Sequence, residues 1–392
     1  MHDCCIVGGG VIGLSIAWEL ARRGQSVSVL SWDPPQNRAS WAAAGIFPAQ
    51  PQDTSVQLKG TPIEQQTQYS DRLHRQWAKS LLEETGIDNG FRRCGSLALA
   101  TTTKTESDIL NCVENWKRLH VEHKSISAKD VRELEPAINS EFITAHMRSA
   151  YYLPNESQVR PPRHLKALQE ACLRRGVEIV DNALVKNFIF DSDQIVSVNV
   201  EGQDLACCSM HAATFCIAAG ARSESLLQKL HLSLPTRPWR GQILLHKTDP
   251  GTVRHIINIG SGLDYIIPRD DGHLLIGSTI EDVGFDLSNT PFSLNRLGTL
   301  ASELFSYLRS HQPKKSWAGL RPGSPDGLPT IGRVPTLDNA WLATGHYRSG
   351  FHLSTGTAQL IANSMCGISS EVQLDFFSAE RAGLEAPSRL VS

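Results

Sequence analysis

Six residues near the N-terminus have the types and the spacing of a phosphate-binding turn. They read Gly8-Gly9-Gly10-Val11-Ile12-Gly13, which satisfies GxGxxG, with an apolar run before them and a helical pattern after them. Gly8 permits the tight turn, Gly10 lets a pyrophosphate approach the backbone, and Gly13 lets the helix pack on the strand. Since the first N–H groups of a helix attract anions, the turn predicts dinucleotide binding, with Val11 and Ile12 beside the phosphates. The alternative is a purely structural glycine-rich turn.

The residue expected at the ribose departs from the usual pattern. An Asp or Glu normally follows the turn by about 20 residues and binds the ribose hydroxyls. Here the run VSVL ends in Ser31, 18 residues beyond Gly13. A serine hydroxyl makes fewer hydrogen bonds to a diol than a carboxylate does. We expect Ser31 at the ribose, with Asp33 as the rival.

A second segment of small residues could also contact the nucleotide. It reads Arg38-Ala39-Ser40-Trp41-Ala42-Ala43-Ala44-Gly45. Small side chains and a glycine let a flat ring or a phosphate lie close to the backbone, and Arg38 or Ser40 could contact a phosphate. An ordinary alanine-rich helix start is the alternative.

The segments that carry these residues are predicted to alternate between strands and helices. The opening predicts a strand at 4–7, a helix at 11–23 and a strand at 27–30, which together form a βαβ unit. Helical patterns follow at 64–86, 104–120, 163–175, 293–310 and 350–366, and strand patterns at 95–101, 177–180, 184–200, 213–221 and within 237–278.

This order predicts an α/β protein with two interleaved domains. A Rossmann-like nucleotide-binding domain (1–50, 155–235 and 318–375) would alternate with an α+β substrate domain (51–154 and 236–317) built on a mainly antiparallel sheet. A cleft between them would hold ligands.

Composition excludes several classes of protein. With 392 residues, 41% hydrophobic and 20% charged, the chain has the makeup of a globular protein. A net charge of −2 with scattered Lys and Arg argues against nucleic-acid binding. The longest uncharged stretch, 349–370, is too polar to span a membrane, and the N-terminus lacks the basic residues of a signal peptide, so we expect a cytoplasmic protein.

No metal centre is expected. The nine cysteines include no CxxC, and the histidines show neither HxH nor HxxxH spacing. Buried, reduced thiols are the simplest interpretation of the cysteines. No Ser-His-Asp order stands out either, so nucleophilic catalysis is not predicted.

Two signatures near the C-terminus complete an ordered set of four. They are Trp317-Ala318-Gly319-Leu320-Arg321-Pro322, followed by DGLPTIG at 326–332, and Ala343-Thr344-Gly345-His346-Tyr347-Arg348-Ser349-Gly350. On these motifs the chain resembles, over nearly its whole length, the D-amino-acid oxidase family of FAD-dependent oxidoreductases. Within that family it is most similar to the glycine oxidases associated with thiamine biosynthesis.

The resemblance implies roles at the substrate site. In such enzymes the Tyr of Y-I-x-P-R and the Arg of A-G-L-R-P bind the substrate carboxylate, which matches Tyr265 and Arg321 here. The Arg of G-H-x-R-x-G lines the pocket and matches Arg348, and Ile280 stands where many relatives place a flexible Met over the substrate. The implied cofactor contacts are Gly8, Gly10, Val11, Ile12, Gly13, Ser31, Ser40, Ala43, Ala44, Gly45, Val185, Ala219, Gly220, Arg348, Ser349, Gly350, Phe351, His352 and Leu353.

The residue types support these roles, although plainer ones remain. A planar guanidinium suits a carboxylate, and a tyrosine hydroxyl adds a directional donor. The alternatives are a surface salt bridge for Arg321, a core tyrosine at 265, and a structural or flavin-contacting role for Arg348. No side chain is expected to act as a catalytic base, and His346 and His352 are expected to be structural.

The implied reaction is oxidation of a small amino acid, glycine first, to its imine. Hydrolysis would give glyoxylate and ammonia, and oxygen would be reduced to hydrogen peroxide; the imine could supply thiamine biosynthesis. Sarcosine-type oxidases often attach FAD to a C-terminal Cys, which the segment LRPGSPDGLP lacks, so the FAD is expected to be non-covalent.

Two other functions stay open at this point. One is a dehydrogenase of D-amino acids or secondary amines that passes electrons to an acceptor other than oxygen. The other is a non-catalytic FAD-binding protein. The expected partners are the amino acid and oxygen, and a homo-oligomer is compatible with the sequence.

Overall fold

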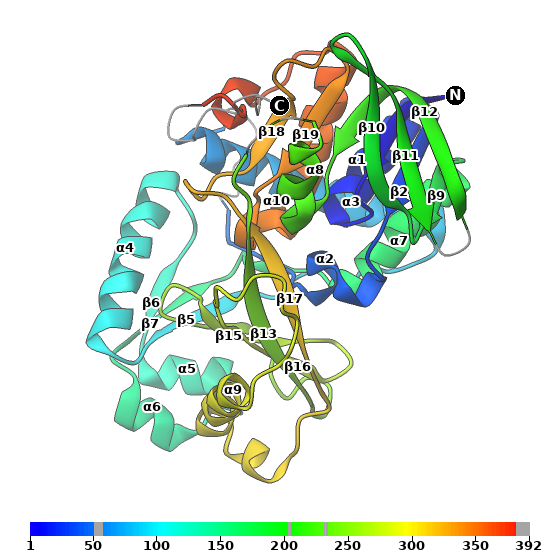
Figure 1. The fold of residues 1–392 in the computed structure, drawn as a ribbon. Coiled ribbons are helices and arrows are strands. Elements are labelled where there is room, and N and C mark those ends of the chain that lie inside the picture. The colour runs from blue at the N-terminus through cyan, green and yellow to red at the C-terminus, as the bar shows by residue number, and fades with distance from the viewer. Residues whose placement is uncertain (51–57, 203–204, 231, 233, 382–392) are drawn as a thin grey trace.

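The computed structural model describes residues 1–50, 58–202, 205–230, 232 and 234–381. Two large β-sheets lie side by side, and each is covered by helices (Figure 1). The first residues expected for the substrate domain, 51–57, lie outside the described residues. The fold is the mixed α/β architecture that the sequence predicts.

The first sheet carries the glycine-rich turn. Its parallel core pairs β12 (Leu205–Ile217), β1 (His2–Val7), β2 (Val27–Ser31) and β9 (Glu178–Asp181). β19 (Ala340–Thr344) extends it beside β12, and β10 (Leu184–Asp191), β11 (Gln194–Gly202) and β18 (Thr330–Arg333) add antiparallel strands. α1 (Val11–Arg22), α7 (Pro161–Arg174) and α10 (Gly350–Met365) pack together over one face around Trp18 and Phe351.

The second sheet is mainly antiparallel. Its strand order is β17 (Lys315–Gly323), β13 (Arg237–Lys247), β16 (His273–Gly277), β15 (Asp264–Pro268), β14 (Ile256–Ile259), β5 (Ser96–Ala100), β7 (Ser149–Leu153) and β6 (Lys124–Ile126). The long strands β13 and β17 run from the first sheet's side into this sheet (Figure 1). Through them the two parts of the molecule are joined.

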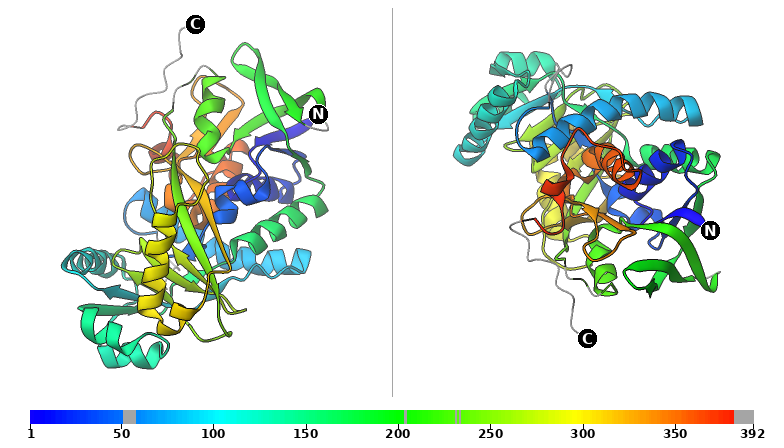
Figure 2. Two further views of the ribbon diagram at one scale, coloured as in Figure 1. Left: turned by 60° about the horizontal axis from the view of Figure 1, so that its bottom comes forward. Right: turned by 90° about the horizontal axis from the view of Figure 1, so that it is seen from above.

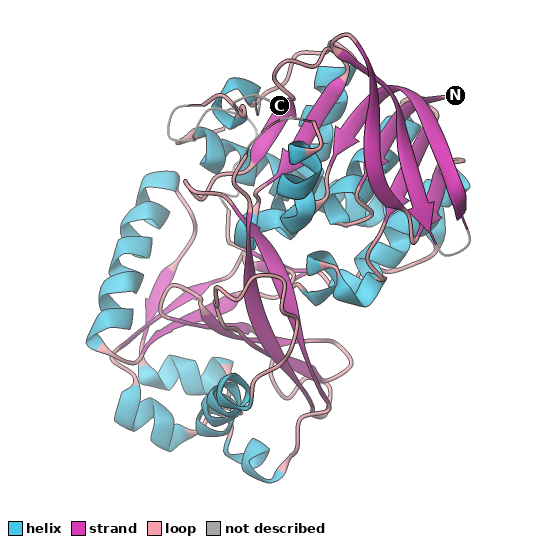
Figure 3. Cartoon of the chain, viewed as in Figure 1, coloured by secondary structure: helices cyan, strands magenta, loops and turns pink. Residues whose placement is uncertain are grey.

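The two faces of the second sheet differ. α5 (Ala128–Leu134), α6 (Ser140–His146) and α9 (Pro291–Leu304) cover one face with a large apolar core, and α9, yellow in Figure 2, packs beside β13. Figure 3 shows these helices gathered on the side away from the first sheet. The opposite face points toward the first sheet and carries Tyr265 in a smaller cluster. It is therefore the face that can meet a ligand held between the sheets.

Several further helices and short strands complete the fold. They are α2 (Ala39–Ala42), β3 (Ile46–Phe47), α3 (Pro62–Thr85), β4 (Arg92–Arg93), α4 (Thr103–Leu119), β8 (Ser157–Gln158) and α8 (Ser223–Gln228). α3 packs on α10 and α7, whereas β17 pairs along its length with β13. The domain division stays a proposal, and this packing favours counting α3 with the first sheet and all of β17 with the second.

Among the described residues, no helix is long and apolar enough to cross a membrane. The eight cysteines whose side chains are described are free thiols, and Cys207 has no described side chain. No cluster of metal-ligating side chains occurs within the described part of the chain.

Candidate functional site

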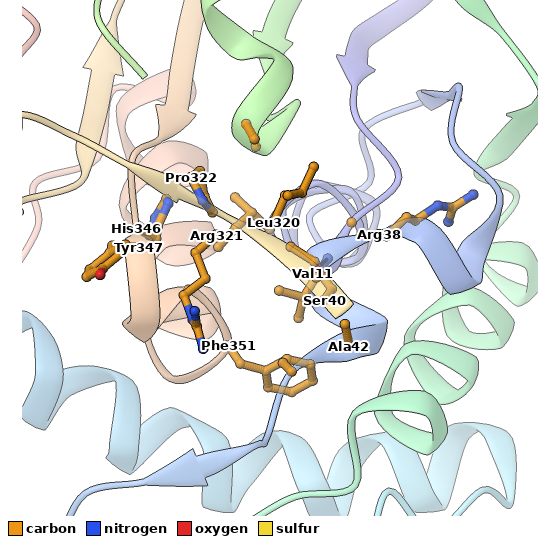
Figure 4. A pocket seen from close by; sticks show the side chains of 18 of the residues that line it. Val11, Arg38, Ser40, Ala42, Leu320, Arg321, Pro322, His346, Tyr347 and Phe351 are labelled. Carbon is orange, nitrogen blue, oxygen red and sulfur yellow. Dashed lines mark hydrogen bonds between the residues drawn. The ribbon is translucent and has the colours of Figure 1, made fainter. Parts of the chain in front are cut away.

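A cavity of about 940 Å³ lies between the two sheets. The glycine-rich turn borders it on one side, and the Tyr265 face of the second sheet borders it on the other. In Figure 4 the Arg321 side chain reaches from β17 into this space, while Val11 and Ser40 lie together at the start of α1. The residues predicted from distant motifs thus meet around one space.

The glycine-rich turn leaves no room for side chains. Gly8 has φ +130°, and a Cβ there would lie 2.3 Å from the Ala218 carbonyl oxygen. A Cβ on Gly13 would lie 1.8 Å from the carbonyl oxygen of Gly8, so the helix and the strand touch as the spacing predicts. The Val11 N–H donates to the Ser40 hydroxyl at 2.9 Å, which ties the alanine-rich segment to the start of α1.

Ser31 and Asp33 both border the cavity, in different settings. Ser31 ends β2 and is 2% exposed. The Asp33 carboxylate is engaged by Arg222, whose Nε and Nη2 donate at 2.9 and 3.2 Å. Arg38 links the loop after β2 to the glycine-rich turn by donating to the carbonyl oxygens of Asp33, at 2.8 Å, and Gly9, at 2.9 Å.

Most of the predicted site residues border the cavity. They are Gly8, Gly10, Val11, Ile12, Ser31, Ser40, Ala43, Ala44, Gly45, Val185, Ala219, Gly220, Tyr265, Arg321, Arg348, Ser349, Gly350, Phe351 and His352. Three are not among its lining residues. Gly13 serves helix–strand packing, Leu353 is buried in α10, and Ile280 is 36% exposed in the loop after β16.

Arg321 is held in place without an acidic partner. Its Nη1 donates to the Thr279 carbonyl at 2.9 Å, and its Nη2 donates to the Ser278 hydroxyl at 2.9 Å. The guanidinium lies flat on Gly241, where a Cβ would approach it to 2.3 Å. Burial lowers the pKa of Arg321, as does Arg348, while Tyr265 opposes the shift. A half-buried cation that borders a cavity, with no ion pair among the described residues, suits an anionic ligand.

Tyr265 and Arg348 flank Arg321. The Tyr265 ring lies against Gly277, where a Cβ would meet its hydroxyl at 2.5 Å, and the side chain is 5% exposed. Its hydroxyl makes no hydrogen bond with the described residues and borders the cavity. Arg348 is exposed at the rim and donates to the Gly262 carbonyl at 2.6 Å.

The two histidines of the C-terminal motif are buried and neutral. Burial lowers the pKa of His346 and of His352 to about 3. His346 Nε2 lies 3.0 Å from the Thr357 hydroxyl, and His352 stacks on Phe47 with ring centroids 5.0 Å apart. Both side chains are packed in this way and also border the cavity, and their structural role stays a prediction.

Several residues that line the cavity were not predicted from the sequence. Arg222, Asn258, Glu156 and Trp116 border it, yet none lies in a recognisable motif. Their place depends on strand register and on the packing of α4, which no local pattern encodes. The engagement of Asp33 by Arg222 could not be read from the sequence for the same reason.

The residues present fit a bound dinucleotide. A glycine turn without Cβ atoms, the N-terminus of α1 and a border of small side chains form the cradle that a pyrophosphate needs. The fold and the cavity therefore define a dinucleotide-binding α/β protein whose second sheet faces the same cavity.

Comparison with known proteins gives the family. The family model described as FAD dependent oxidoreductase (DAO) matches residues 3–364, and the chain belongs to this family. The chain is 33% identical to a glycine oxidase of Pseudomonas aeruginosa over 365 residues, covering 92% of this chain and 94% of that protein. It is 31% identical to the bifunctional protein ThiO/ThiG of Trichormus variabilis, covering 97% of this chain and 55% of that protein.

A solved structure of similar fold supports the same family. The crystal structure of glycine oxidase from Geobacillus kaustophilus superposes with a TM-score of 0.86 at 29% identity, covering 96% of this chain and 98% of that one. The chain is thus an FAD-dependent oxidoreductase, and the resemblance stated from its motifs is confirmed.

Proposed function

We propose that this enzyme oxidises a small amino acid, with glycine as the first candidate, to its imine. The net reaction converts glycine, oxygen and water into glyoxylate, ammonia and hydrogen peroxide. When bound, FAD supplies the redox chemistry by accepting a hydride from the carbon that bears the amine. The relatives named glycine oxidase support this choice of substrate.

The observation that carries the proposal is the half-buried guanidinium of Arg321, which borders the cavity and forms no ion pair among the described residues. A substrate carboxylate would complete its charge, and the Tyr265 hydroxyl, which has no other partner among the described residues, would donate a further hydrogen bond. The strands that carry both groups are rigid parts of one sheet. Two such donors would orient the α-carbon of the substrate, and orienting the substrate is the main contribution of the protein to this reaction.

No side chain is assigned as an obligatory base. His346 and His352 are neutral and packed, as described above, and substrate enters the reaction with its amine unprotonated. Arg348 at the rim, tied to Gly262, would help to close the cavity and to exclude water once substrate is bound.

The proposal also covers the pathway that would use the product and the way in which FAD is bound. The similarity to a ThiO/ThiG protein supports a supply of imine to thiamine biosynthesis, although this chain spans about half of that protein. The segment LRPGSPDGLP offers no thiol for covalent attachment, so FAD should be released on denaturation.

An anaerobic screen tests the proposed function. Glycine, sarcosine and D-amino acids are mixed with the holoprotein, and bleaching of the oxidised flavin band is followed before oxygen is admitted. Bleaching by glycine, followed by recovery of colour and release of peroxide, is the expected result. Bleaching without reoxidation by oxygen would identify a dehydrogenase, and failure of every amine to bleach the flavin would overturn the oxidase.

A further inference from the structure

The cavity continues past Tyr265 to a second polar patch. Asn258 on β14 pairs directly with Tyr265 on β15, so both side chains project from one face of the sheet, with Cβ atoms about 5 Å apart. Ala98 on β5 pairs with Asn258 on its other side and leaves space above the sheet. Asn258, Ala98 and Glu156 all border the cavity. The floor therefore runs from Arg321 across Tyr265 and Asn258 to Glu156.

Glu156 is a buried carboxylate with few donors. It is 6% exposed, and the Asn258 amide Nδ2 donates to its two oxygens at 3.4 and 3.2 Å. It forms no ion pair among the described residues. Burial raises the pKa of Glu156 to about 7, against the lowering influence of the Ser96 hydroxyl and the Asn258 amide. Since an ionised carboxylate can accept about four hydrogen bonds, most of this capacity is unused.

Two other buried glutamates in this fold have the hydrogen-bond or ion-pair partners expected of a structural carboxylate. Glu135 accepts from the backbone N–H of Arg254, at 2.9 Å, and from the backbone and ring of His255. Glu19 forms ion pairs with Arg22 and Arg23. Neither of the two borders the cavity, whereas Glu156 does and has no such partners.

The lining on this side of the cavity suits a cationic group. Trp116 of α4 borders the cavity and packs with Ala98 and Leu153. An ammonium is stabilised both by a carboxylate and by the face of an indole ring. Within the described residues no protein cation fills this role, so the ligand must bring the positive charge.

We propose that Glu156 and Asn258 form a second substrate subsite, which binds an ammonium group at the end of the substrate's side chain. The subsite rests on the proposed oxidation of an amino acid whose carboxylate is held by Arg321 and Tyr265. The Tyr265 hydroxyl lies over Gly277 of β16, two strands from Asn258 on β14, which is roughly 9–10 Å at about 4.8 Å per strand. An extended amino acid with roughly three to four side-chain carbons, with a hydrogen bond at each end, spans that separation. The substrate class is then a basic amino acid of the ornithine or lysine type, with glycine filling the first subsite alone.

Ligand binding tests the subsite without turnover. The flavin absorbance of the holoprotein is titrated with 5-aminopentanoate, which lacks an α-amine, and with pentanoate, which also lacks the distal ammonium. Wild type should bind 5-aminopentanoate about tenfold or more tightly, as expected for a hydrogen bond between charged groups. Glu156→Gln should bring the two affinities within about threefold. The matched control is Glu122→Gln, which changes an exposed acid near Asn155 and should keep the wild-type ratio.

Equal affinity of wild type for the two acids would overturn the subsite, as would a preference that survives in Glu156→Gln. The comparison of the two acids in wild type needs no variant, so its outcome does not depend on whether Glu156→Gln folds. A second comparison uses the rate of anaerobic flavin reduction by ornithine and by norvaline, each as both enantiomers. Bleaching by glycine without a preference for ornithine would overturn the subsite and keep the proposed oxidase. Failure of every amino acid to bleach the flavin would overturn the oxidase, and the titration would still decide the subsite.

Discussion

The two ends of the cavity are built in different ways. The nucleotide end consists largely of backbone and small side chains from two short stretches of the chain, Gly8–Ile12 and Ala42–Gly45. The opposite end consists of Arg321, Tyr265 and Asn258, which come from three strands of the second sheet. On the proposed function, the nucleotide end would bind FAD by its shape and backbone N–H groups, while the other end would bind substrate by a few charged or polar atoms. Substitutions should therefore act differently at the two ends.

The largest effect is expected from Gly8→Ala. The new Cβ would lie 2.3 Å from the Ala218 carbonyl oxygen at a φ of +130° that L residues avoid, at a cost of about 2–5 kcal/mol in folding or FAD binding. The purified variant should lack the yellow colour of FAD. Gly24→Ala is the control, since Gly24 also has positive φ, +83°, but nothing within 4 Å, and it should cost only about 1–2 kcal/mol and keep FAD. An equal loss of FAD in both variants would reject steric exclusion at the turn.

At the substrate end, Arg321→Met should lower kcat/KM for glycine by roughly 30-fold to several thousand-fold. Removing one partner of a buried charge pair costs about 2–5 kcal/mol, and the loss falls on the substrate carboxylate. The FAD content should stay normal, and a simple amine without a carboxylate should lose far less. Steady-state kinetics on the two substrates make the comparison. A similar fall for both would leave Arg348 as the candidate anchor.

Glu156 predicts a pH dependence of stability. Its pKa of about 7 in the folded chain exceeds the ordinary value of 4.5, so the unfolded chain ionises first as the pH rises. The free energy of unfolding should therefore fall by up to about 3 kcal/mol between pH 4.5 and 8, and Glu156→Gln should remove this component. Urea unfolding of wild type, Glu156→Gln and Glu122→Gln at pH 5 and pH 8 measures it. The prediction fails if the three proteins lose stability in parallel.

The smallest effect is expected at the ribose. If Ser31 contacts the ribose, Ser31→Glu should hold FAD more tightly by about 1 kcal/mol, the net scale of one hydrogen bond. Dissociation constants of FAD decide this, with Asp33→Asn as the companion variant. No gain in Ser31→Glu, together with weaker binding in Asp33→Asn, would move the ribose contact to Asp33 and show that Arg222 does not occupy it fully.

Secondary structure followed the sequence where the signals were local. The helices predicted at 64–86, 104–120 and 350–366 are found as Pro62–Thr85, Thr103–Leu119 and Gly350–Met365. The single strand predicted at 184–200 is instead the hairpin of β10 and β11, which turns at Ser192 with φ +55°. At this hairpin, polar residues interrupt the alternation of apolar residues, which is a signal for a turn that the sequence contains. The capping box of Ser127 and Asp130, which starts α5, is a second local signal that the sequence contains.

The dinucleotide turn, the fold class and the family could be predicted from the sequence, because each depends on motifs whose residues are close together along the chain. The arrangement of residues at the other end of the cavity could not be predicted, since it depends on packing between distant segments. The register of β14 against β15 puts Asn258 beside Tyr265, and the loop after β7 brings Glu156 to Asn258, although 102 positions separate the two in the chain. Packing across such distances depends on the whole sheet, and no short pattern of residues carries it.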